Sequence, residues 1–205
     1  MFSKIKKFLV ILKYDIIFLV KIMFAYFPMH DIGSFLRLRY YNFYLKKVGG
    51  IGYKARLAFG FLLYNNGKLE IGESFATGPH VTILPGDSFG VIIGNNVSLA
   101  HGTYIRASNH NYTEIDKLIM ESGHMAKKIC TNDGREASVI IENDVICGAN
   151  TIFLSGAKIG TGTVIAAGSI ISSEIPPFSI VVGNPARVVG SRKNFISPKK
   201  YFMFE

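Results

Sequence analysis

Apolar residues recur at every sixth position between Ile141 and Ile171. The fifth position of each repeat is small or β-branched. An α-helix would repeat near 3.6 residues and a strand near two, so neither accounts for a period of six. The pattern predicts a coil of short strands, in which each side contributes an inward residue and a tight corner. The opening positions are Ile141, Cys147, Phe153, Ile159, Ile165 and Ile171, and the fifth positions are Val145, Thr151, Ala157, Thr163 and Ser169.

The same repeat occurs upstream of this run. Residues 93–104 form two repeats and residues 71–82 form another pair, in which Phe75 fits the small position poorly. A four-residue insertion is expected between these pairs, at residues 85–90. The pattern is lost over residues 110–138, which predicts a long loop projecting from the coil. Loops of that length in a compact domain are usually functional or disordered.

Length and composition fit one domain with appendages. The chain has 205 residues and is 49% hydrophobic, which is ample for a core. Its 21 glycines suit a coil that turns a corner every six residues. Cys130 and Cys147 lack the spacing of a metal or disulfide motif, which fits a reduced, cytoplasmic setting. We expect a mainly β protein with a helical segment at residues 1–50, a coil at 51–175 and a C-terminal segment at 176–205.

The first 28 residues are strongly apolar, but charges divide the apolar run. Lys13, Asp15 and Lys21 interrupt it, so no stretch reaches the ~20 residues that a spanning helix needs. Lys6, Lys13 and Lys21 fall within one sector of a helical wheel. A signal peptide is not expected, because no small-residue cleavage site follows. We favour a basic amphipathic helix in a membrane interface. A helix packed on the coil or on a sister subunit, and a true membrane span, are the alternatives.

Residues 34–48 continue this basic and aromatic character. Arg37, Arg39, Lys46 and Lys47 contribute to the net charge of +9. Basic and aromatic residues together can indicate nucleic-acid binding, but no recognition motif accompanies them, so nucleic acid is not expected as a partner. Anionic lipid head groups or phosphorylated small molecules explain the charge equally well.

Two motifs beyond the repeats carry a resemblance to a known family. Ser-Asn-His-Asn-Tyr at 108–112 leaves the coil, and the repeats end on Ile-Pro-Pro at 175–177 and Val-Gly-Asn-Pro-Ala-Arg-Val at 182–188. With the hexads, these motifs resemble the hexapeptide-repeat acyltransferases, and among them the maltose/galactoside acetyltransferases and the O-acetyltransferases of bacterial polysaccharide synthesis. The similarity covers about residues 68–190. It implies a left-handed parallel β-helix, an exception to the usual right-handed crossover, in a homotrimer with active sites between neighbouring coils.

His110 occupies the position of the family's general base, at the start of the loop that follows Ile105. Acyl transfer from a thioester to a sugar hydroxyl needs a base that takes the hydroxyl proton as the oxygen attacks. Imidazole titrates close to neutral pH, which suits this task. No covalent enzyme intermediate is needed if both substrates bind together. The alternative is a loop histidine held by backbone hydrogen bonds.

The other histidines carry weaker expectations. His80 lies where relatives place polar side chains that contact substrate, while His101 is expected to be structural and His124 to be a surface residue of the loop. The gamma-type carbonic anhydrases hold zinc on a similar coil, with two histidines five residues apart and a third one coil away. The gaps from His80 through His101 and His110 to His124 are 21, 9 and 14 residues. They do not match, so no metal is expected.

The resemblance implies acetyl-CoA as a co-substrate, with no permanently bound cofactor. Relatives hold the pantetheine arm between two coils through backbone groups, so the side chains there need not be conspicuous. Relatives often have Lys where Ser173 stands and a basic residue where Gly190 stands, and Arg192 and Lys193 are candidates to replace that charge. The residues matched to coenzyme A binding are Ala149, Ala167, Ser172, Ser173 and Arg187, the last near the nucleotide phosphates.

Gly78 and His80 mark the expected acceptor pocket. Gly78 replaces a polar residue that the simple galactoside enzymes use for sugar binding, which disfavours a free mono- or disaccharide. The resemblance therefore implies an O-acetyltransferase that modifies a saccharide hydroxyl in bacterial surface polysaccharide synthesis. We expect it in the cytoplasm, with a peripheral contact to the inner membrane.

Two other functions remain open. One is N-acylation of an amino sugar on a nucleotide diphosphate carrier, although such enzymes commonly add a Rossmann-like N-terminal domain whose glycine pattern is absent here. The other is a non-catalytic β-helix scaffold, which predicts no coenzyme A binding and no effect of His110→Ala. Acetyl and longer acyl donors are both compatible with the sequence.

Overall fold

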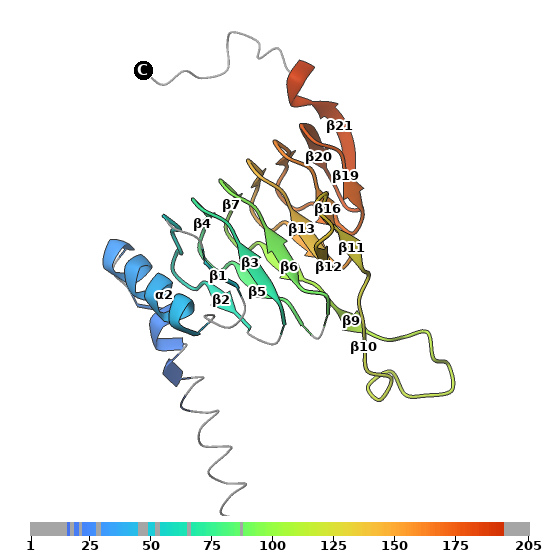
Figure 1. The fold of residues 1–205 in the computed structure, drawn as a ribbon, viewed down its shortest axis with the longest axis horizontal. Coiled ribbons are helices and arrows are strands. Elements are labelled where there is room, and N and C mark those ends of the chain that lie inside the picture. Colours follow the sequence, from blue (N-terminus) through green and yellow to red (C-terminus); the bar gives the residue numbers. More distant parts are fainter. Residues whose placement is uncertain are drawn as a thin grey trace, which may run out of the picture.

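The chain forms a parallel β-helix, with a helix across one end and a loop projecting from its side (Figure 1). The strands are two to five residues long and are stacked in three sheets. The structure is a computed structural model that describes residues 16, 19–20, 22–27, 30–44, 49–51, 54–64, 67–86 and 88–194.

Each turn of the coil contributes one strand to each sheet. Sheet A contains β1 (Gly49–Ile51), β3 (Leu69–Ile71), β6 (Val91–Ile93), β13 (Val139–Ile141), β16 (Lys158–Ile159) and β19 (Glu174–Ile175), in spatial order. Sheet B contains β4 (Ala76–Thr77), β7 (Ser98–Leu99), β14 (Ile146–Cys147), β17 (Val164–Ile165), β20 (Ser179–Val182) and β21 (Arg187–Ser191). Sheet C contains β2 (Leu62–Leu63), β5 (Thr82–Leu84), β8 (Tyr104–Arg106), β15 (Ile152–Leu154) and β18 (Ile170–Ile171).

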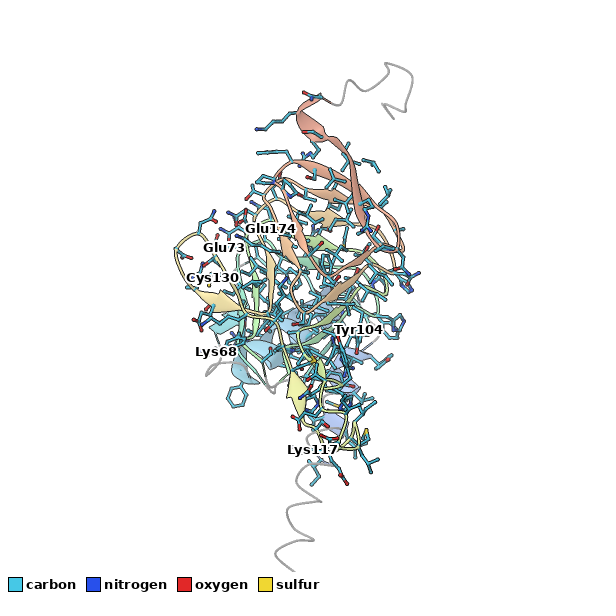
Figure 2. All side chains as sticks on the ribbon, turned by 90° about the vertical axis from the view of Figure 1, so that its right-hand side faces the viewer. Lys68, Glu73, Tyr104, Lys117, Cys130 and Glu174 are labelled. Atoms are coloured by element: carbon cyan, nitrogen blue, oxygen red, sulfur yellow. The ribbon has the colours of Figure 1, made fainter. Side chains whose placement is uncertain are left out.

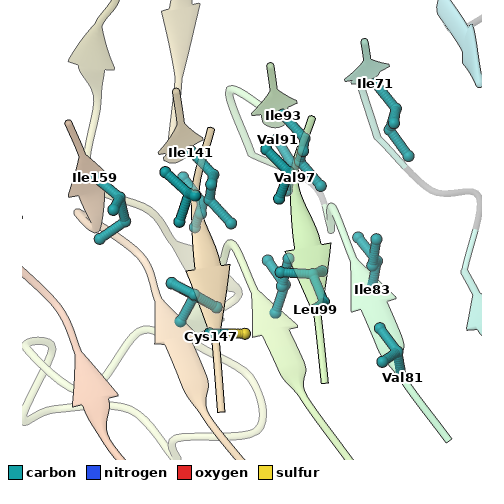
Figure 3. Packing of buried hydrophobic residues seen from close by; sticks show 14 of the residues in the cluster. Ile71, Val81, Ile83, Val91, Ile93, Val97, Leu99, Ile141, Cys147 and Ile159 are labelled. Atoms are coloured by element: carbon teal, nitrogen blue, oxygen red, sulfur yellow. The ribbon is translucent and has the colours of Figure 1, made fainter. Parts of the chain in front are cut away.

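The six-residue frame sets the register of these strands. Ile141 pairs with Ile159, and Phe153 pairs with Ile171, each eighteen residues or three repeats further on. The opening residues of the repeats are buried, and those of sheet A stack in a column inside the coil (Figure 3). Phe75, which fits the repeat poorly, is also fully buried in this core. The frame therefore predicts the inward positions correctly.

Buried hydroxyls explain why the fifth position of a repeat is so often Thr or Ser. Thr151, Thr163 and Ser169 are buried, and each donates to the carbonyl oxygen three residues earlier at 2.7–2.8 Å. A buried hydroxyl needs such a partner to avoid a desolvation cost. The fifth position thus combines a small volume with a hydrogen bond that closes the corner.

The corners between sheets use left-handed backbone conformations. We call the corner between sheets B and C the second corner; it contains His80, Gly102, Asn150 and Gly168, all with φ between 56° and 71°. Successive turns are linked there, because the Asn150 N–H donates to the His101 carbonyl at 2.8 Å. We call the corner between sheets C and A the third corner, and the long loop leaves the coil there. Helix-like order along each corner fixes which side chains project from it.

Helix α2 (His30–Tyr44) lies across the N-terminal end of the coil (Figure 1). Its buried side chains pair with backbone groups of the first turn, which has no further turn to pair with. Ser34 accepts from the Leu57 N–H at 3.1 Å, the Arg37 guanidinium donates to the Leu57 carbonyl at 2.8 Å, and the Tyr41 hydroxyl donates to the Phe61 carbonyl at 3.1 Å. The helix therefore caps the open end of the coil.

Arg37 is the one basic residue of this segment whose location differs most from a surface charge. Its side chain is 2% exposed and also donates to the Phe27 carbonyl at 3.1 Å. Burial lowers the pKa of the guanidinium below its usual value. It is therefore unavailable to lipid or phosphate groups, in contrast to Arg39, which is exposed.

The long loop consists of two parts. Strands β9 (Asn109–His110) and β10 (His124–Met125) pair antiparallel and carry a projecting tip, while β11 (Ile129–Cys130) and β12 (Glu136–Ala137) form a hairpin. The hairpin covers outward residues of sheet A, where Ala137 and Ile129 pack on Ile92 and Ile140. Arg135 bridges Asp133 at 2.9 Å and also contacts Glu70, which ties the hairpin to the coil.

The expected amphipathic helix over the first 28 residues lies largely outside the described residues. The described helical residues 22–25 pack against the cap: Ala25 is buried, its carbonyl accepts from the Gly60 N–H at 2.7 Å, and Phe24 stacks on Tyr40 at 5.0 Å. Among the helices in the described part of the chain, none has both the length and the apolar character needed to cross a membrane.

Candidate active site

His110 lies at the base of the loop, where the chain leaves the third corner. It belongs to β9 and is half-buried. Its cross-strand partner in the antiparallel pair is His124 of β10, and the two imidazole rings are stacked with centroids 4.9 Å apart and planes at 28°. The position of His110 is therefore set by a strand pair and a ring contact, not by a freely moving loop.

Local hydrogen bonds hold the chain just after His110. The Asn111 N–H donates to the Gly123 carbonyl at 3.0 Å, and the Asn111 side-chain oxygen accepts from the Thr113 N–H at 3.0 Å. Beyond them the loop projects away from the coil, with Lys117 at its far tip (Figure 2). The base of the loop is thus ordered by backbone pairing, which is what a positioned base requires.

The residues matched to coenzyme A binding lie at different corners. Ala149 and Ala167 are neighbours on the second corner, where the Gly168 N–H donates to the Ala149 carbonyl at 2.8 Å. A Cβ on Gly148 would collide with the backbone of Ala167, so the two turns approach closely there. Small side chains leave the backbone groups of this corner accessible to a thread-like ligand.

Ser172 and Ser173 lie at the third corner and are exposed. The loop reaches them, because a Cβ on Gly156 would meet both the Ser172 carbonyl at 3.0 Å and the Lys127 side chain at 2.7 Å. Arg187 begins β21, is exposed and donates to the Ala186 carbonyl at 2.9 Å. Arg192 is engaged elsewhere, since it pairs with Asp144 at 3.1 Å and donates to the Gly162 carbonyl at 2.7 Å.

Gly78 and His80 lie on the second corner, toward the N-terminal end of the coil. A Cβ on Gly78 would come within 2.5 Å of the His101 backbone nitrogen, which explains physically why no polar side chain stands there. His80 is exposed and makes edge contacts with the rings of His101 at 5.6 Å and Phe59 at 5.5 Å. Tyr26 lies 6.1 Å from His80, which adds a fourth ring to this cluster.

One chain does not bring all these residues together. His110 lies at one end of the sheet C strands, whereas Ala149, Ala167 and His80 lie at the other end. Strand β8 separates the two corners, and at about 3.3 Å per residue the six residues from Gly102 to Ser108 span roughly 20 Å. Any site that uses His110 together with the second corner therefore requires a second copy of the chain.

His124 is the residue of this region that sequence reasoning missed. It was expected to be a surface residue of the loop, and it is exposed, but its ring lies against that of His110. The pairing of β9 with β10 spans the irregular tip, so no periodic signal in the sequence indicates it. In the described residues, no three His, Cys, Asp or Glu side chains form a group that could hold a metal ion.

Comparison with known proteins supports the fold. No family model matches the chain. A 2,3,4,5-tetrahydropyridine-2,6-dicarboxylate N-acetyltransferase from Staphylococcus aureus is 40% identical over 62 residues, which are 30% of this chain and 26% of that protein. The chain thus matches about a quarter of the length of such curated relatives.

Three solved structures are similar over most of the chain. A hexapeptide-repeat acetyltransferase from Vibrio cholerae has a TM-score of 0.63 and 24% identity, over 78% of this chain and 82% of that one. A galactoside acetyltransferase in complex with coenzyme A has a TM-score of 0.61 and 21% identity, over 83% and 76%. A maltose O-acetyltransferase from Clostridium difficile has a TM-score of 0.54 and 25% identity, over 80% and 79%.

The chain is therefore a hexapeptide-repeat protein with a left-handed parallel β-helix, as its repeats predict. The three solved proteins that share this fold with it are acetyltransferases, which confirms the resemblance at the level of the fold.

Proposed function

We propose that this protein is an O-acetyltransferase that transfers an acetyl group from acetyl-CoA to a saccharide hydroxyl. The observation that carries the proposal is His110, a half-buried imidazole fixed by the β9–β10 pair at the edge of a hexapeptide coil. The similarity to a maltose O-acetyltransferase over 80% of the chain supports the same reaction.

The reaction needs one base and no covalent enzyme intermediate. His110 takes the proton of the acceptor hydroxyl while its oxygen attacks the thioester carbonyl carbon. A C–O bond forms, the C–S bond breaks as the tetrahedral intermediate collapses, and the imidazolium returns the proton to the departing thiolate. The products are the acetyl ester and free coenzyme A, so His110 ends in its starting state.

The donor would lie along the second corner. Ala149 and Ala167 expose backbone groups there, Ser172 and Ser173 line the third corner, and Arg187 offers a cation to the nucleotide phosphates. The galactoside acetyltransferase with similar fold was solved with coenzyme A, which supports this class of donor. Gly78 and His80 would contact the acceptor, with the imidazole and Phe59 rings beside it.

The active site would form between copies in a homotrimer. His110 and the second corner of one chain are separated by a strand of sheet C, so a neighbouring copy must supply one of them. The outward residues of sheet C are half-buried and mostly apolar, which supports packing against another copy. They are Leu62, Leu84, Tyr104, Ile152, Leu154 and Ile170.

The acceptor would be a glycan intermediate of surface polysaccharide synthesis, handled in the cytoplasm beside the inner membrane. Gly78 has no room for a side chain that would grip a small free sugar. The basic, apolar N-terminal segment would bring the enzyme to lipid-linked saccharides. N-acylation is a second candidate, favoured by the 40% identity to an N-acetyltransferase over 62 residues. An amine acceptor on a nucleotide sugar tests it directly.

The decisive assay measures thiol release from acetyl-CoA with a panel of hydroxyl and amine acceptors. We expect acceptor-dependent release that falls by about 10²–10⁴-fold in both His110→Ala and His110→Asn, because each removes the base. Coenzyme A binding, measured by calorimetry, should persist in both variants. Unchanged release in these variants would exclude His110 as the base, and no coenzyme A binding by the wild type would favour the scaffold function.

A mixing experiment tests the intersubunit site. Ala167→Trp should block the donor corner, so this variant and His110→Ala should each be inactive alone. Co-refolded mixtures should regain part of the activity, because some sites combine an intact base with an intact corner. No recovery in mixed trimers would mean that one chain supplies both groups.

A further inference from the structure

Helix α2 exposes its apolar face. Ile32, Phe35, Arg39 and Phe43 follow one another at helical spacing and project from one side of the helix. The three apolar side chains are 54%, 59% and 82% exposed, in that order. The opposite side carries Arg37, which is buried. This is the reverse of the usual surface helix, whose apolar stripe faces the core.

The capping role of α2 explains the polar side but not the apolar one. The buried side is polar because it must satisfy backbone groups of the first turn. Nothing in the coil requires Phe35 or Phe43, since the core beneath is closed by Tyr41 and Phe61, whose rings meet edge to face at 5.2 Å. Large exposed aromatic side chains in a row indicate a surface that contacts something other than water.

A second stripe lies on the helical residues that precede α2. Ile16, Leu19, Val20 and Met23 are all exposed. Their spacing of three or four residues places them on one side of a helix. The N-terminal end of the molecule thus presents two apolar stripes, on consecutive helical segments.

The charge of the chain is concentrated at the same end. Residues 1–60 contain 11 of the 23 Lys and Arg but only two of the 14 Asp and Glu, which accounts for the whole net charge of +9. The remainder of the chain is neutral in total. Within the stripe the Arg39 guanidinium lies over the Phe35 ring, 5.8 Å from its centroid. No acidic side chain is found among the described side chains of α2.

We infer that the exposed face of α2, defined by Ile32, Phe35, Arg39 and Phe43, docks on an anionic lipid bilayer. Phenylalanine and isoleucine enter the boundary between head groups and acyl chains, and Arg39 remains at the level of the phosphates. A second copy of the chain is a poorer occupant, because two ends that each carry the full positive charge repel. The inference rests on the membrane location proposed above and not on acetyl transfer.

Vesicle flotation with the full chain tests this inference. The vesicles are phosphatidylcholine alone, and phosphatidylcholine with phosphatidylglycerol in a three-to-one ratio. The wild type should float with the anionic vesicles only, and less at high salt. Phe35→Ser with Phe43→Ser should lower the partition coefficient by about 100-fold, since each ring contributes about tenfold. Arg39→Gln should lower it by about fivefold.

Matched controls lie elsewhere on the surface. Leu118→Ser with Ile119→Ser removes two exposed apolar side chains from the loop tip and should leave flotation unchanged. Lys193→Gln removes a cation that lies over the Phe178 ring at 4.6 Å, at the other end of the coil, and should also have no effect. Coenzyme A binding should be the same in all variants, which separates this test from that of the enzyme activity.

Three results would overturn the inference. The first is a wild type that does not float with anionic vesicles. The second is full flotation of the Phe35→Ser and Phe43→Ser double variant, which would assign membrane binding to other residues. The third is a change in the mass of the assembly in that variant, measured by light scattering, which would show that the face is buried between copies.

Discussion

Ile159 provides the sharpest test of the six-residue frame, because a change of one residue in register would put it on the outside. It is fully buried and stacks in the sheet A column between Ile141 and Ile175. Ile159→Asp removes the apolar side chain, which costs about 2–5 kcal/mol for an Ile truncated in a core. It also places a carboxyl group where no described polar side chain can pair with it.

The charge adds a second, pH-dependent cost. Keeping the introduced carboxyl neutral at pH 7 requires its pKa to rise by about three units from ~3.9, which costs about 4 kcal/mol. The total of about 6–9 kcal/mol is comparable to the whole stability of a domain, ~5–15 kcal/mol. The native state would hold a proton that the unfolded chain releases above about pH 4, so the free energy of unfolding should fall as pH rises from about 4 to 7.

Urea unfolding followed by far-ultraviolet circular dichroism measures these effects. Ile159→Asn is the matched control, because it is polar but does not titrate, and it should lack the pH slope. Ile146→Asp controls for position, since Ile146 precedes the buried Cys147 and faces outward, and should cost less than about 1 kcal/mol. A wild-type midpoint for Ile159→Asp at pH 7 would refute the register. Equal slopes for the Asp and Asn variants would refute the charge argument.

Three further predictions concern the cap, the thiols and the loop. Tyr41→Phe leaves a coil-end carbonyl without its donor and should lower the free energy of unfolding by about 1–3 kcal/mol in urea melts; no change would show that water replaces the hydroxyl. Cys130 should react with Ellman's reagent in the native protein, while Cys147, whose pKa is raised by burial, should react only on unfolding; equal rates would contradict its burial. His124→Ala should lower kcat by about tenfold without changing the KM for acetyl-CoA, and His124→Phe should restore most of the loss by stacking on His110. Equal losses in both variants would contradict a positioning role.

The repeats predict the coil well because each position has one physical requirement. An opening residue such as Phe153 must be apolar to face the interior, and a fifth residue such as Thr163 must be small with a local acceptor. These requirements recur every six residues, so they are visible without a structure. The insertion before β6 also follows from the frame, because only a break in period separates the two runs.

The parts that the sequence does not predict depend on contacts between distant segments. Arg37 resembles any surface cation in the sequence, and only the position of Leu57 at the open end of the coil explains its burial. His124 resembles a loop residue, and only the β9–β10 pair brings it to His110. The separation of His110 from Ala149 is likewise a property of the coil, since adjacent corners lie at opposite ends of a strand.

The cap on the first turn also bears on how the molecules behave toward one another. A β-helix without a cap presents unpaired strand edges, and such edges recruit the edges of other chains. Residues Ser34, Arg37 and Tyr41 occupy the groups through which another coil would add on. Deleting α2 should therefore convert a discrete particle into one that grows end to end, with the coil axis as the direction of a fibre.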